Sequence, residues 1–250
     1  MTGMLTAAGW GLFAGAALLV GAAVAWFIRV PPKVVGSVMA FGSGVLVSAV
    51  AFELFEEAAR TGGLWSAVLG FAGGAAAYML ANMVLARYGA RHRKRSQDQQ
   101  PSRGEQSGSG LAIALGALLD GIPESLVLGI SLLGGGGVSA AVVAAVFISN
   151  LPEGLSSAAG MKKAGRGAGY VFGVWGTIAL VSAVSAGAGY LLLGSAPDGV
   201  IGAITAIAGG AILTMIADTM IPEAFEITHA WTGLITSGGF LLAAAISWLG

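Results

Sequence analysis

Long apolar runs separated by short polar breaks extend along the whole chain. A membrane-spanning helix needs roughly 20 mostly apolar residues, and the runs are continuously apolar rather than alternating, as β-barrel strands would be. The pattern predicts an all-α integral membrane protein, one domain over residues 1–250 built as an eight-transmembrane-helix bundle. The predicted helices lie at about 8–28, 34–52, 65–87, 110–134, 137–159, 169–194, 198–220 and 232–249.

The first apolar run resembles a signal peptide only in part. Small residues end it, but it lacks a basic segment in front and Arg29 follows it instead. We therefore expect the run to be retained as a helix rather than cleaved.

Composition supports a lipid-embedded chain. Hydrophobic residues make up 56% of the chain and charged residues 10%, against about 25% charged in a typical soluble domain. The 42 glycines suit close helix packing in lipid. The absence of cysteine excludes thiolate metal sites, and a net charge of zero gives no sign of a nucleic-acid partner. The expected environment is the lipid bilayer.

Basic residues are confined almost entirely to alternate loops. Eleven of the twelve fall in three loops on one side of an eight-helix arrangement, and only Arg60 lies opposite. The positive-inside rule then predicts a multi-pass protein of the cell (inner) membrane with these loops in the cytoplasm and both termini outside. The polar segment 88–109, rich in Arg, Ser, Gln and Gly, is predicted to be a flexible cytoplasmic loop.

The fourth predicted helix carries two carboxylates near its middle. Asp120 and Glu124 are four residues apart and share one helix face. A carboxylate at the membrane centre costs roughly 2.5–3.5 kcal/mol, so such residues usually face a bundle interior and mark an ion or proton route. Pro123 cannot donate a hydrogen bond to the carbonyl of Leu119, and the expected kink exposes carbonyl oxygens.

The fifth predicted helix repeats this arrangement. Ser149 and Glu153 are again four apart, with Asn150 one position round and Pro152 just before the glutamate. A lone proline is usually a packing kink, but two Pro-Glu pairs on neighbouring helices favour an ion site. Carbonyl, amide, hydroxyl and three carboxylate groups would suit a hard or borderline divalent cation. Similar motifs on antiparallel helices also suggest an inverted repeat.

Further acidic residues end the second and seventh predicted helices. Glu53 and Glu57 lie at one, Asp218 and Glu223 at the other. They could be entrance and exit ligands for a central site, or interfacial acids in contact with water. His229, after the seventh helix, is interpreted as a loop residue, with an exit ligand as the alternative.

At these motifs the chain resembles the ZIP family of zinc and iron permeases. That family carries His-Asn-x-Pro-Glu-Gly on its fourth helix and a similar motif on its fifth. Residues 150–154, Asn-Leu-Pro-Glu-Gly, match the fifth-helix motif, Pro-Glu at 123–124 matches the fourth, and Ile-Pro-Glu at 221–223 is similar to the end of the seventh. The resemblance implies eight helices, both termini outside, a kinked transport core of helices 4 and 5, and a homodimer.

The chain departs from the family pattern in its nitrogen ligands. The family histidines fall at Asp120 and Ser149, and the second-helix histidine at Glu53. The sixth-helix glutamate falls at Ser182. The resemblance thus implies one cation site rather than two, built from Asp120, Glu124 and Glu153 with help from Ser149 and Asn150. Without imidazole ligands, the preference is expected to shift from zinc toward manganese or iron(II).

The predicted function is import of zinc, iron(II) or manganese as a transported substrate, with no prosthetic group and no enzymatic activity. One alternative is a proton-coupled carrier or channel for another cation, which would use the same carboxylates as proton relays. Another is a degenerate scaffold that does not transport. An intramembrane hydrolase is disfavoured, because no histidine and no paired catalytic motif lies within the predicted helices.

Overall fold

A computed structural model of the chain describes residues 1–87, 109–133 and 139–249, without the side chains of 109–114 and 141. The predicted loop therefore lies, apart from its last residue, outside the described residues. Within them the chain is helical and contains no strand. The helices are α1 (Thr2–Phe27), α2 (Pro32–Ala49), α3 (Glu56–Gly62), α4 (Leu64–Arg87), α5 (Ser109–Ser131), α6 (Ala140–Lys163), α7 (Ala168–Leu193), α8 (Asp198–Met215), α9 (Ile221–Thr228) and α10 (Trp231–Leu249), with π-helical segments η1 (Val50–Phe55) and η3 (Ile216–Met220).

Most of these helices are long and apolar. In the part of the chain that the structure describes, seven helical stretches have the length and composition to cross a membrane, two of them continuous through a π-helical segment. The helix α5, with 23 residues, is comparable in length. The chain is therefore a multi-pass membrane protein with an all-helical fold.

Two helices extend well beyond their predicted ends. The stretch predicted at 34–52 continues as one helix over Pro32–Gly62, and that predicted at 198–220 continues over Asp198–Thr228. The prediction ended each helix where carboxylates interrupt the apolar run, but Glu, Leu and Ala all favour helical backbone. The helix over Pro32–Gly62 ends only before Gly63, which has a φ of 81°.

The helices pack in two groups. In one, α1 packs along α6 and α7, and α7 packs along α5. In the other, α4 packs along α8, and α10 packs along α2. The groups meet where α2 contacts α6 and where α5 contacts α8, so the two motif-bearing helices lie at the boundary between the groups.

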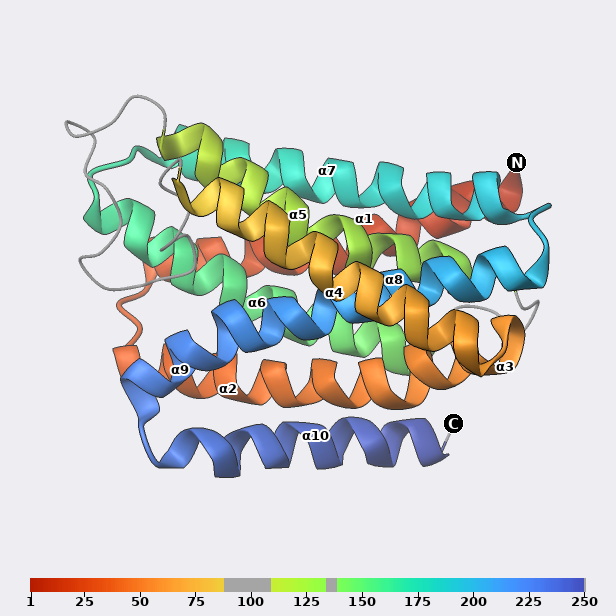
Figure 1. The fold of residues 1–250 in the computed structure, drawn as a ribbon. Helices are drawn as coiled ribbons and strands as arrows, with labels where there is room; N and C mark the ends of the chain where they lie inside the picture. Colours follow the sequence, from red (N-terminus) through yellow and green to blue (C-terminus); the bar gives the residue numbers. More distant parts are fainter. Residues whose placement is uncertain (88–108, 134–138, 250) are drawn as a thin grey trace.

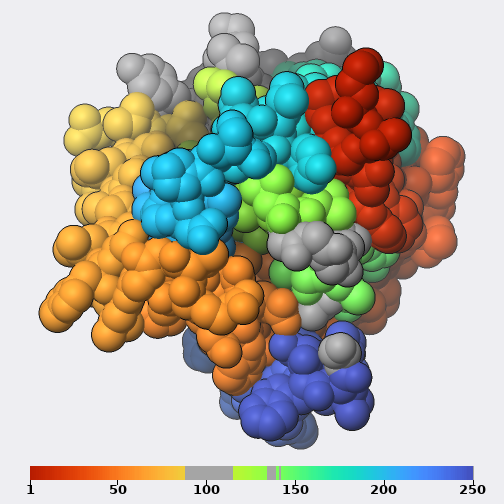
Figure 2. Space-filling view, turned by 90° about the vertical axis from the view of Figure 1, so that its right-hand side faces the viewer, coloured from red at the N-terminus to blue at the C-terminus, as the bar shows by residue number. Residues whose placement is uncertain are grey.

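The start of α1 and the end of α10 lie at the same end of the bundle (Figure 1). Viewed from that end, α10 lies at the edge of the molecule, beside the segment that contains α3 (Figure 2). Termini at one end are what an even number of membrane crossings requires.

Glycines bring the backbones of paired helices into contact. A Cβ atom on Gly44 of α2 would overlap the carbonyl oxygen of Thr236 on α10, and one on Gly239 of α10 would overlap that of Phe41 on α2. The pair formed by α4 and α8 repeats this arrangement: Gly74 meets the carbonyl of Ile207, and Gly210 meets that of Phe71. Such close approach is typical of helices that associate in lipid.

These contacts reveal an internal repeat. The same number of residues separates Gly44 from Gly210, Phe41 from Ile207, and Val50, where η1 begins, from Ile216, where η3 begins. In Figure 1 the α2–α3 helix and the α8–α9 helix run in opposite directions. The repeat is thus inverted, an arrangement found in many membrane transporters.

Candidate metal site

The two proline motifs place their polar side chains inside the bundle. Pro123 lies within α5 and Pro152 within α6, and both helices continue through the proline. The exposed fractions of Asp120, Glu124 and Glu153 are 2%, 1% and 5%. Because these carboxylates lie on the two helices at the boundary between the helix groups, the chain keeps three acidic groups away from lipid and bulk water.

The neutral polar residues of the α6 motif have packing contacts. The Nδ2 atom of Asn150 donates to the carbonyl of Ala14 on α1 at 3.0 Å, and the hydroxyl of Ser149 donates to the carbonyl of Val146 at 3.0 Å. The amide of Asn150 thus ties α6 to α1. Its oxygen is the atom that could bind a cation, since an amide nitrogen is a donor only.

Buried polar residues continue along α6 beyond the motif. Ser156 and Ser157, at 0% and 1% exposure, lie three and four residues after Glu153 and so on the same face of the helix. The hydroxyl of Ser156 donates to Oε1 of Glu223 on α9 at 3.4 Å. Glu223, predicted as an exit ligand, is therefore buried beside this face. The sequence analysis missed both serines, although their spacing from Glu153 is a visible signal.

The tyrosine Tyr78 also reaches the site. Its hydroxyl donates a hydrogen bond to Oδ1 of Asp120, which joins α4 to α5, and the side chain is 2% exposed. The sequence analysis overlooked Tyr78, because the two residues are 42 positions apart and only the fold brings them together.

Glu124 borders a small cavity at the meeting of α2, η1, α5, α6 and α8. Its volume of about 10 Å³ is roughly enough for one water molecule. Glu124 is the sole acidic residue in its lining, which otherwise consists of Leu46, Ala49, Val50, Leu54, Val127, Val142, Ala145, Val146 and Ile212. The surroundings of the site are thus apolar toward the start of α6 and polar toward its end.

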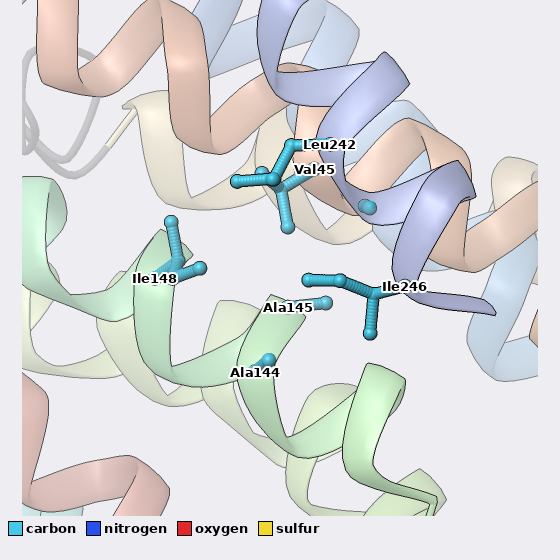
Figure 3. Close-up of a pocket in the computed structure, with 7 residues that line it drawn as sticks. Val45, Ala144, Ala145, Ile148, Leu242 and Ile246 are labelled. Atoms are coloured by element: carbon cyan, nitrogen blue, oxygen red, sulfur yellow. The ribbon is translucent and has the colours of Figure 1, made fainter. Parts of the chain in front are cut away.

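A second cavity offers no ligands. It lies between α2, α6 and α10, where Leu242 and Ile246 of α10 face Ala144, Ala145 and Ile148 of α6 (Figure 3). All its lining side chains are aliphatic. This cavity therefore adds nothing to the candidate site, which we assign to the buried carboxylates of α5 and α6.

Glu53, predicted as an entrance ligand, lies in η1 and is partly buried. Its Oε2 atom accepts a hydrogen bond from Ser139 at 3.1 Å, and its Oε1 atom accepts one from Ser247 of α10 at 2.5 Å. Ser139 also caps α6, since its hydroxyl accepts from the backbone N–H of Val142. Glu53 therefore joins three helices at one end of the bundle, through partners that its local sequence does not indicate.

The other predicted peripheral ligands lie apart from the carboxylate region. Glu57 forms an ion pair with Arg60 at 2.5 Å on the same helix. Asp218 is exposed in η3, and His229 is exposed in the turn between α9 and α10 with a φ of 47°. Of the residues predicted at the two helix ends, only Glu223 is buried beside α6.

The described residues contain no group of three His, Cys, Asp or Glu side chains arranged to hold one metal ion. Asp120 and Glu124 on α5 and Glu153 on α6 are thus buried without being joined in a coordination shell. A cation would require some of these side chains to change rotamer.

Comparison with protein-family models finds no match, and comparison with curated proteins finds none either. The resemblance to the zinc and iron permeases rests on the motif residues of this chain.

Proposed function

We propose that this protein transports a divalent metal cation across the membrane by way of Asp120, Glu124 and Glu153. The observation that carries the proposal is the burial of three carboxylates on the helices α5 and α6 of a multi-pass membrane protein. Buried acidic groups without a compensating role are expensive in such a setting. A divalent cation among them would offset their charge.

The donor set favours a hard or borderline cation. Carboxylate, hydroxyl, amide and carbonyl oxygens suit manganese or iron(II), and zinc accepts carboxylate oxygen as well. No histidine lies in α5 or α6. We therefore expect manganese and iron(II) to compete at least as well as zinc.

The surroundings of the site support a direction of movement. Toward the start of α6, Glu124 borders an apolar cavity with room for about one water, whereas Ser156, Ser157 and Glu223 provide polar groups toward the other end. In this conformation a cation would leave more readily toward the end of α6 that carries Lys162 and Lys163. By the positive-inside rule that end is cytoplasmic, so we propose import by alternating access through an inner-membrane protein.

The proposal predicts that neutralising either glutamate strongly reduces transport. Glu124→Gln and Glu153→Gln should each lower manganese uptake into proteoliposomes on the order of tenfold or more, because each removes a negative ligand. Glu56→Gln is the matched control, since Glu56 is exposed on the second long helix.

Direct binding separates this function from its alternatives. Manganese should bind the purified protein and be lost in both glutamine variants. Proton-driven movement of another cation without manganese binding would favour the carrier alternative, and uptake that is undiminished in both variants would remove these residues from the site.

A further inference from the structure

Tyr78 is an exception on its helix. The helix α4 is largely exposed, with large apolar side chains such as Trp65, Leu69 and Leu80 on its surface, and its buried residues are Ala67, Gly74 and Tyr78. A tyrosine that is 2% exposed on such a helix must point into the bundle. Its hydroxyl then needs a polar partner, because an unsatisfied hydroxyl in an apolar setting is costly.

Gly74 positions this tyrosine. It lies one turn before Tyr78, where the absence of a side chain lets α4 approach the carbonyl of Ile207 on α8. Residues four apart share a helix face, so the same close approach directs Tyr78 toward the interior. From there it reaches Asp120 on α5.

The contact occupies one oxygen of a proposed cation ligand. The Tyr78 hydroxyl donates to Oδ1 of Asp120, and both residues are 2% exposed. Bulk water is excluded from the pair, so a hydrogen bond to a carboxylate is strong there. The hydrogen bond thus holds Asp120 toward α4. Among the described residues, no three His, Cys, Asp or Glu side chains are close enough together to bind one metal ion.

We propose that Tyr78 is a positioning residue of the cation site, which holds Asp120 away from the position where the carboxylate would bind the metal. This inference rests on the proposed function. A cation must displace the tyrosine hydroxyl before it gains Asp120 as a ligand, so Tyr78 weakens binding. Weaker binding favours release, which a transport site requires as much as capture.

A double-mutant cycle tests the inference. Manganese affinity is measured by calorimetry on the full-length protein in detergent for the wild type, Tyr78→Phe, Asp120→Asn and the double variant. We expect Tyr78→Phe to bind manganese roughly tenfold more tightly, because it removes a hydrogen bond to a charged group. The same change in the Asp120→Asn background should have a much smaller effect, since the hydrogen bond from Tyr78 to a charged carboxylate is then absent.

A matched control separates this effect from loss of any buried phenol. The hydroxyl of Tyr170 finds no hydrogen-bond partner among the described residues, so Tyr170→Phe should leave manganese affinity unchanged. Equal or weaker affinity in Tyr78→Phe would overturn the inference, and so would the same tightening with and without Asp120.

An infrared measurement tests displacement of the Tyr78 hydroxyl without a substitution at Tyr78. Difference infrared spectra of protein labelled with isotopic tyrosine should show a change in a tyrosine C–O band when manganese is added to the wild type, and no such change in Asp120→Asn. A band that does not respond in the wild type would contradict displacement of the hydroxyl.

The outcomes distinguish this inference from the proposed function. A wild type that binds no manganese defeats the proposed function and the role of Tyr78 with it. A wild type that binds manganese, loses it in Glu124→Gln and Glu153→Gln, and keeps its affinity in Tyr78→Phe defeats the role of Tyr78 alone.

Discussion

Asp120 is buried on α5, and its carboxylate accepts a hydrogen bond from Tyr78. The burial of Asp120, Glu124 and Glu153 could be predicted, because acidic residues in long apolar runs must face a bundle interior. Their partners could not be predicted. Tyr78, which contacts Asp120, is far away in the sequence, and local patterns carry no information about such contacts. Cation binding by these residues stays a prediction.

The type of ligand at position 120 should determine metal preference. Asp120→His replaces an oxygen ligand by an imidazole nitrogen, which suits zinc better than manganese. We expect the ratio of zinc to manganese affinity to rise on the order of tenfold. Competition titrations on the purified variant measure this ratio, with Asp120→Asn as the control for loss of charge. A ratio equal to that of the wild type would show that position 120 does not contact the cation.

The helices themselves were largely predictable, because each needs a long apolar run to cross the bilayer. The residues at which the helices end were less predictable. The predicted ends at 52 and 220 were wrong, since the helices continue through η1 and η3 to Gly62 and Thr228. An apolar run shows where lipid contact ends, whereas helical backbone continues until a breaker such as Gly63 intervenes.

Adjacent glycines on α4 allow a sharp test of helix packing. A Cβ on Gly74 would overlap the carbonyl of Ile207, whereas nothing lies within 4 Å of one on Gly73. Gly74→Ala should therefore lower the free energy of unfolding by about 1–3 kcal/mol, the usual range for overpacking. Gly73→Ala is the matched control and should be at least as stable as the wild type in a thermal scan, because Ala favours a helix over Gly. Equal stability of the two variants would mean that α4 and α8 are less closely packed than described.

At the scale of the whole molecule, the similar motifs on α5 and α6 suggested an inverted repeat. The structure shows the repeat between other helices. The glycine contacts of α2 with α10 and of α4 with α8 define it. Sequence spacing alone could not reveal this pairing, since it depends on which helices are neighbours. The orientation in the membrane stays a prediction from the basic loops.

Single cysteines can test that orientation, because the chain has none of its own. Ser195 is exposed between α7 and α8, and Gly167 is exposed between α6 and α7. A membrane-impermeant maleimide should label Ser195→Cys in intact cells but label Gly167→Cys only after the membrane is permeabilised. The opposite pattern would reverse the orientation and make the proposed import an export.

The two π-helical segments allow the end of each long helix to rotate about the helix axis. A π turn accommodates more residues than an α turn, and one residue of an α-helix corresponds to about 100° about its axis. If η3 tightened to regular α geometry, α9 would turn by about that angle, and Glu223 would swing away from Ser156 without any helix unfolding. Because η1 stands at the equivalent place in the opposite half, the same small change could reorient Glu53 at the other end of the bundle.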